Sequence, residues 1–149
     1  MKPPFRADQV GSLLRPKELS DARKSFKAGN LKEQELKQVE NRCIREAIAR
    51  QEAIGLQSIT DGEMRRDWWH MDFMTQLDGV TAVTNPGPVF VGTDEQPPIP
   101  SVTGKVGCSK PIMVGDFVFL KQNTKQAAKF TIPSPAMLHL RGGRSSISK

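Results

Sequence analysis

Three short segments of the sequence combine small, polar and charged residues in a way that suits ligand binding. They are the loop at 9–16 with Gly11 and Ser12, the turn at 61–63, and the loop at 133–135 with Ser134. Because Gly11 lets the backbone approach a ligand, N–H groups exposed beside it suit an anion. The residues alone fit a plain strand-to-helix turn equally well, so anion binding is one of two interpretations.

The turn at 61–63 carries two carboxylates and is followed by basic and aromatic residues. Glu63 is either a ligand-binding carboxylate or a turn acid that pairs with Arg65 or Arg66. Asp61 is a second candidate in the same turn. His70 follows two tryptophans, and it is either part of a pocket wall or a packed histidine satisfied by hydrogen bonds. These alternatives stay open at the level of the residues.

Hydrophobic periodicity and turn residues indicate the elements that position these segments. Asn30 with Glu33 predicts a capped start for the longest helix. We expect strands at 5–8, 56–60 and 128–132, helices at 16–27, 31–54, 67–77, 113–123 and 136–140, and a β-rich excursion at about 80–111. Strands that alternate with helices favour parallel βα units. Since a closed barrel needs about 250 residues, the sheet is either small and open or part of an incomplete barrel.

The composition is that of an ordinary globular protein, with 26% charged and 37% hydrophobic residues among 149. The net charge of +6 suits anionic small ligands. Basic residues are dispersed among acids, which argues against nucleic acid as a partner. No apolar run is long enough for a membrane span, and no secretory signal begins the chain, so a cytoplasmic location is expected. Cys43 and Cys108 are expected to be reduced thiols.

Several blocks of the sequence resemble the catalytic domain of the cobalamin-independent methionine synthase family. The resemblance rests on residues 5–16, 59–66, 69–73, 77–79 and 129–143, in the order that the family has them. It implies an α/β fold, the N-terminal part of a (β/α)8 TIM barrel. Residues 1–149 would then form a partial barrel domain with the first three βα units and a β-hairpin excursion.

The family resemblance also implies a reaction. Family members transfer a methyl group from 5-methyltetrahydrofolate to homocysteine, a small thiol, and zinc holds that thiol as the nucleophilic thiolate. The family's zinc ligands come from later strands, so the fragment alone is expected to be inactive. Gly107 or Ser109 stands where the family has an arginine near folate. The alternatives are a related thiol alkyl transferase of the coenzyme M type, and a non-catalytic interaction fragment that self-associates through exposed barrel edges.

The same resemblance assigns substrate contacts to particular residues. Gly11 and Ser12 match the motif that holds the carboxylate of homocysteine, and Glu63 matches the carboxylate that meets its ammonium group. The remaining implied contacts are Asp61, Arg66, His70 and Ser134. The assignment predicts that Ser12 and Glu63 face the same small pocket.

Overall fold

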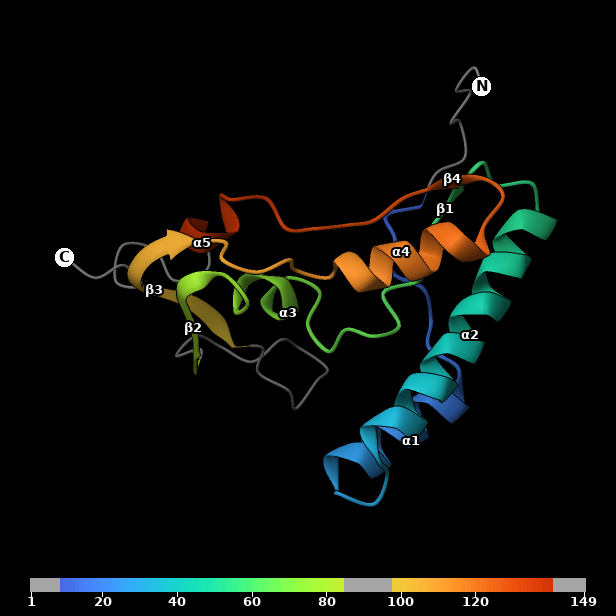
Figure 1. Ribbon diagram of the computed structural model, residues 1–149, viewed down its shortest axis with the longest axis horizontal. Coiled ribbons are helices and arrows are strands. Elements are labelled where there is room, and N and C mark those ends of the chain that lie inside the picture. Colours follow the sequence, from blue (N-terminus) through green and yellow to red (C-terminus); the bar gives the residue numbers. More distant parts are fainter. Residues whose placement is uncertain (1–8, 85–97, 141–149) are drawn as a thin grey trace. The chain divides into compact units, whose positions relative to one another are not determined.

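The structure, a computed structural model, describes residues 9–84 and 98–140, which form two compact units. The first unit takes the residues up to Arg65 together with Gly115–Thr131, and the second takes Arg66–Val114 and the residues from Ile132 onward. Figure 1 shows the elements along the chain. A single partial barrel domain over residues 1–149 stays a prediction.

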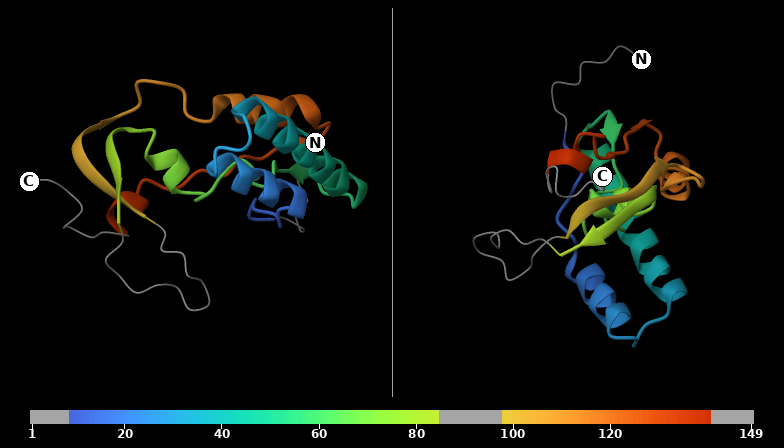
Figure 2. Two further views of the ribbon diagram at one scale, coloured as in Figure 1. Left: turned by 90° about the horizontal axis from the view of Figure 1, so that it is seen from below. Right: turned by 90° about the vertical axis from the view of Figure 1, so that its left-hand side faces the viewer.

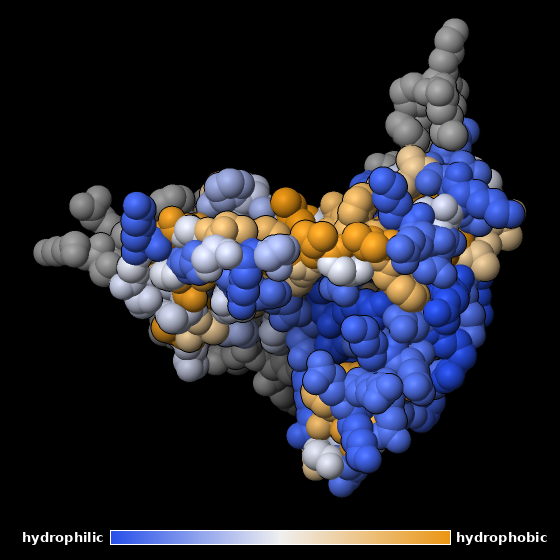
Figure 3. All heavy atoms as spheres, in the orientation of Figure 1, coloured by the Kyte–Doolittle hydropathy of each residue, from blue (hydrophilic) through white to orange (hydrophobic). Residues whose placement is uncertain are grey.

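Two amphipathic helices dominate the first unit. They are α1 (Lys17–Lys27) and α2 (Glu33–Ala53), which confirm the helices predicted at 16–27 and 31–54. The two helices lie side by side in both views of Figure 2, and Figure 3 shows their visible outer faces to be mostly hydrophilic. Their inner faces join a hydrophobic core that comprises Leu19, Leu36, Cys43, Ile44, Ala47, Ile48, Ile59, Met64 and Leu120.

The start of α2 corrects the sequence prediction by two residues. The helix is capped at Lys32, whose extended backbone precedes the first turn, and not at Asn30. The carboxylate of Glu35 accepts the backbone N–H of Lys32 at 2.9 Å. This bond satisfies the N–H of the capping residue itself. The N-cap is therefore Lys32, the residue three positions before the glutamate that accepts this bond.

A short parallel pair of strands completes the first unit. Strand β1 (Ser58–Ile59) pairs with β4 (Ala127–Ala128), and α4 (Val114–Asn123) precedes β4 in the chain. The parallel pairing confirms the predicted arrangement of βα units, although both strands are shorter than expected. No closed sheet exists within residues 9–84 and 98–140, and the strand predicted at 5–8 lies outside them. Residues 60–63 and 129–131 follow the carboxyl ends of the two strands, at the same edge.

The second unit contains the β-rich excursion. Strands β2 (Asp78–Val83) and β3 (Ile99–Gly107) pair antiparallel, which confirms the predicted hairpin character in its described part. Both α3 (Met71–Met74) and α5 (Met137–Leu140) pack against β3. No helix among the described residues is long and apolar enough to cross a membrane.

The helix predicted at 67–77 is wrong in length, because only Met71–Met74 is helical. The carboxylate of Asp72 accepts the backbone N–H of Asp67 at 2.6 Å and that of Trp68 at 3.3 Å. These bonds hold the preceding residues in a turn and replace the first turn of the expected helix. A side chain that bonds nearby N–H groups competes in this way with helix formation.

Candidate functional site

The carboxyl ends of β1 and β4 both hold the loop that contains Gly11. After β1, the hydroxyl of Thr60 donates to the carbonyl of Gly11 at 2.8 Å. Beyond β4, the hydroxyl of Thr131 donates to the carbonyl of Val10 at 2.9 Å. Three segments that are distant in sequence therefore meet at one edge of the small sheet, where parallel α/β proteins place their binding sites.

The turn after β1 holds Glu63 in a strained conformation. Glu63 has a φ of 55°, in the left-handed region that non-glycine residues rarely adopt. Its N–H donates to a carboxylate oxygen of Asp61 at 2.9 Å, and Arg15 donates to its carbonyl at 3.2 Å. The N–H of Leu13 also donates to the carbonyl of Gly62 at 3.0 Å. Strain of about 1–3 kcal/mol that neighbouring contacts maintain is a feature of ligand sites.

Gly11 lies directly beside the Glu63 carboxylate. A Cβ atom on Gly11 would be 3.4 Å from Oε1 of Glu63 and 2.5 Å from the hydroxyl oxygen of Thr131. Gly11 has a φ of 140°, and only a residue without a side chain fits this position without strain. Glu63 is 5% exposed, whereas Ser12 is exposed. The structure thus brings Gly11 and Glu63 together, and the orientation of the Ser12 side chain toward the same pocket stays a prediction.

This arrangement places a carboxylate next to a backbone turn. Within residues 9–84 and 98–140, the N–H and hydroxyl of Ser12 have no hydrogen-bond partner. A carboxylate attracts an ammonium group, and N–H groups in a turn attract a carboxylate. The geometry is therefore chemically suited to the two charged groups of a free amino acid.

Three further predicted contacts belong to the second unit. Arg66 and His70 are both buried; Arg66 donates to the carbonyl of Trp69 at 3.4 Å, and the His70 ring lies 5.2 Å from that of Trp69. Ser134 is exposed, and its hydroxyl oxygen accepts the N–H of Ala136 at 3.1 Å. Contact of Arg66, His70 and Ser134 with a substrate stays a prediction.

A buried charge network holds the segment that follows Glu63. Arg65 donates to Glu40 at 3.0 Å, and Arg23 donates to Glu40 at 2.9 Å and to the carbonyl of Met64 at 3.1 Å. Burial raises the pKa of the Glu40 carboxyl, while the guanidinium groups of Arg65 and Arg23 oppose that rise. The network therefore anchors the two residues after the strained turn to both α1 and α2.

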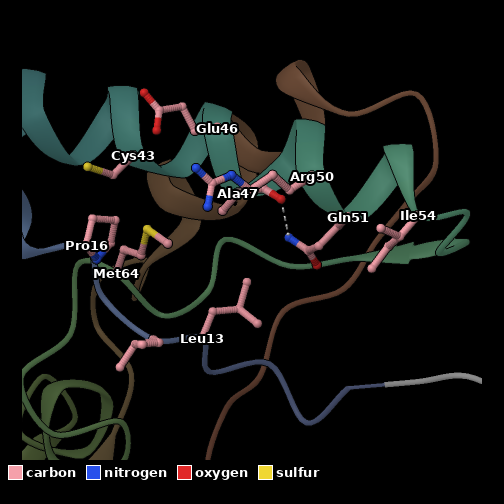
Figure 4. A pocket seen from close by; sticks show the side chains of 10 residues that line it. Leu13, Pro16, Cys43, Glu46, Ala47, Arg50, Gln51, Ile54 and Met64 are labelled. Carbon is pink, nitrogen blue, oxygen red and sulfur yellow. Dashed lines mark hydrogen bonds between the residues drawn. The ribbon is translucent and has the colours of Figure 1, made fainter.

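A separate apolar pocket of about 280 Å³ lies in the first unit. Figure 4 shows it between α2 and the loop that follows Gly11. Its walls are Leu13, Leu14, Pro16, Cys43, Glu46, Ala47, Arg50, Gln51, Ile54 and Met64. It contains none of the predicted substrate contacts, and burial raises the pKa of the Cys43 thiol at its wall.

The described residues do not fit a zinc site. Among residues 9–84 and 98–140, no group of three or more histidine, cysteine or acidic side chains is arranged to hold a metal ion. Cys43 is buried in α2 and Cys108 is exposed, and both thiols are free.

Several residues that build the site were missed by reasoning from the sequence. Thr60 and Thr131 lie near the carboxyl ends of the strands predicted at 56–60 and 128–132. This position is itself a sequence signal for residues of a binding site. Gln51 continues the apolar face of α2 as a buried polar residue, with its side-chain amide bonded to the backbone of Thr60. A polar residue on the apolar face of a helix therefore indicates a buried side chain that makes several hydrogen bonds.

Parallel strands with a glycine loop and a buried carboxylate at their carboxyl ends define an α/β protein with a candidate binding site at the strand ends. Residues 5–136 match the family model described as the cobalamin-independent synthase catalytic domain, and the chain belongs to that family.

Known relatives support the same assignment. The chain is 44% identical to YxjG of Bacillus subtilis (strain 168) over 95% of its length, and 34% identical to a methionine synthase of Sulfurisphaera tokodaii over 85%. It also matches the crystal structure of a putative vitamin-B12-independent methionine synthase from Listeria monocytogenes, with a TM-score of 0.77, 41% identity and 97% of the chain covered. The chain spans 38%, 37% and 40% of these proteins, respectively.

Proposed function

We propose that this chain supplies the amino-acid-binding part of a zinc-dependent methyltransferase, which transfers a methyl group from 5-methyltetrahydrofolate to homocysteine to form methionine. In this proposal the complete fold is a (β/α)8 barrel in the cytoplasm, and these residues are its N-terminal part. The observation that carries it is the position of Gly11 beside the buried, strained Glu63. The family membership supports methyl transfer to homocysteine as the chemistry.

The charges of homocysteine match the groups that meet at this edge. The Glu63 carboxylate receives the substrate ammonium group, and the N–H groups and hydroxyl at Gly11 and Ser12 receive the substrate carboxylate. Asp61 acts indirectly, because its carboxylate accepts the N–H of Glu63 and so maintains the turn. Binding both charged ends fixes the position of the thiol, and such positioning is a major source of rate acceleration.

Amino-acid binding by this chain tests the proposal. We expect L-homocysteine and L-methionine to shift the amide NMR signals of the Gly11 and Glu63 loops. Glu63→Gln should raise the Kd at least about tenfold, because a charge-assisted hydrogen bond becomes a neutral one. Glu33→Gln, at an exposed glutamate in the first turn of α2, is the matched control and should leave the Kd unchanged. Absence of binding, or equal effects of the two substitutions, would contradict the proposal.

The chain by itself is expected to show no methyl transfer. The described residues supply no zinc site, and the relatives are more than twice as long. The measurement is methionine formation from homocysteine and 5-methyltetrahydrofolate with added zinc. Sustained turnover would show that these residues carry the catalytic step themselves. A screen of thiol substrates with the protein from the complete gene would show whether it methylates homocysteine or another thiol, as a related alkyl transferase would.

Exposed apolar side chains favour a second candidate, an interaction fragment that self-associates. Leu14 is 97% exposed, Val10 is 82% exposed and Ile54 is 76% exposed. Exposed apolar residues and strand edges both promote association between chains. Sedimentation velocity over a range of concentrations separates this candidate from a monomer that binds amino acids.

A further inference from the structure

Gln51 uses its whole side-chain amide to hold the end of β1. Its Nε2 donates to the carbonyls of Ala47 at 3.1 Å and Thr60 at 2.9 Å. Its Oε1 accepts the N–H of Thr60 at 3.0 Å and the side-chain amide of Gln9 at 2.7 Å. Gln51 is 4% exposed, and Figure 4 shows it on α2 with its bond to the helix backbone. A primary amide has two donors and two acceptor positions, so this side chain is fully satisfied.

Thr60 carries this connection into both loops of the candidate site. Its hydroxyl donates to the carbonyl of Gly11 at 2.8 Å and accepts the N–H of Gly62 at 3.1 Å. Thr60 is 1% exposed, so water does not replace these bonds readily. One buried hydroxyl thus links the glycine that approaches Glu63 to the residue that immediately precedes Glu63.

The hydroxyl itself, and not the volume of the side chain, makes this link. Valine has nearly the same shape as threonine and would fill the same space, but it would leave the Gly11 carbonyl and the Gly62 N–H without their partner. Fully satisfied buried networks hold their members in one geometry, and a network that loses a member is costly. A binding site needs its contact groups held in place before the ligand arrives.

We propose that Gln51 and Thr60 are positioning residues for amino-acid binding at Gly11 and Glu63. This inference rests on the proposed function. Gln51 fixes the backbone of Thr60 against α2, and the Thr60 hydroxyl then sets the distance between the two loops. Neither side chain needs to touch the substrate, because each acts through groups that do.

A matched pair of substitutions at Thr60 tests the inference on the full chain. Thr60→Val removes the hydroxyl and keeps the shape, whereas Thr60→Ser keeps the hydroxyl and removes a methyl group. For L-methionine and L-homocysteine, Thr60→Val should raise the Kd at least about tenfold, and Thr60→Ser should stay within about threefold of the original chain. Without ligand, the rate of hydrogen exchange of the Gly62 amide with solvent should rise in Thr60→Val and stay the same in Thr60→Ser.

A second variant covers the case in which Thr60→Val does not fold. Gln51→Glu keeps the shape of the side chain, but its ionised carboxylate cannot donate to the carbonyls of Ala47 and Thr60, so the Kd for both amino acids should rise in the same direction. An unchanged Kd in a folded Thr60→Val variant, or an equal rise of the Kd in Thr60→Val and Thr60→Ser, would overturn this inference and leave the proposed function standing. Failure of the unsubstituted chain to bind either amino acid would overturn the proposed function and this inference with it.

Discussion

Gly11→Ala is expected to abolish amino-acid binding and to lower the free energy of unfolding of the first unit by about 3 kcal/mol. The new Cβ would lie 2.5 Å from the hydroxyl oxygen of Thr131, and the backbone φ of 140° is already unfavourable for alanine. Thr131 cannot turn away without breaking its hydrogen bond to Val10. Urea denaturation and titration with L-methionine measure the two effects.

Gly29→Ala is the control for Gly11→Ala. Gly29 has a φ of 76°, and a Cβ there would meet no atom within 4 Å. The control therefore carries backbone strain alone, which costs about 1–2 kcal/mol, and it should leave amino-acid binding intact. If Gly29→Ala weakened binding as much as Gly11→Ala, general destabilisation would explain both, and the close approach of Gly11 to Glu63 would lose its significance.

Arg65→Met is expected to lower the free energy of unfolding by about 3 kcal/mol, because it removes one of the two guanidinium groups that bond to the buried Glu40 carboxylate. Arg65 bonds to Glu40 at 3.0 Å and to Asn41 at 2.7 Å, and it forms an ion pair with Asp116 at 3.1 Å. Its guanidinium also lies 5.0 Å from the centre of the Phe119 ring. Chemical denaturation of Arg65→Met and of the unsubstituted chain measures the difference in their free energies of unfolding.

The loss in Arg65→Met should depend on pH. Burial already raises the pKa of Glu40 in the folded protein, and removing Arg65 raises this pKa further. A folded state with the higher pKa binds more protons than the unfolded state, so the free energy of unfolding falls as pH rises through the folded pKa. Arg65→Met should therefore lose more stability at about pH 7 than at about pH 5, relative to the original chain at each pH.

Arg42→Met is the matched control for Arg65→Met. Arg42 pairs with Glu18 on the surface, where the side chains are 53% and 52% exposed. Exposed pairs of this kind contribute about 0–1 kcal/mol, so the control should change stability little at either pH. A loss in Arg42→Met as large as that in Arg65→Met would show that burial of the network is not the cause.

The amphipathic helices followed from the sequence because their signal is local. The apolar spacing of α1 and α2 repeats within one or two turns, so residues near in sequence determine the element. The helix expected at 67–77 failed for a local reason that periodicity ignores, namely the hydrogen bonds that the N–H groups of Asp67 and Trp68 donate to the Asp72 carboxylate. The cap predicted at Asn30 failed similarly, because the acid that caps α2 is Glu35, which accepts the N–H of Lys32, and not Glu33.

The sequence by itself determined the residue types of the candidate site, namely a glycine, a serine and acids in loops at predicted strand ends, and, through their resemblance to known blocks, the family. Only the tertiary structure decided that Gly11 lies against Glu63, that Thr131 crowds the same point and that Gln51 and Thr60 join the loops. The physical reason is range. A turn or a helix is set by neighbours, whereas the hydrogen bond from Thr131 to Val10 joins residues 121 positions apart and exists only after the strands have paired.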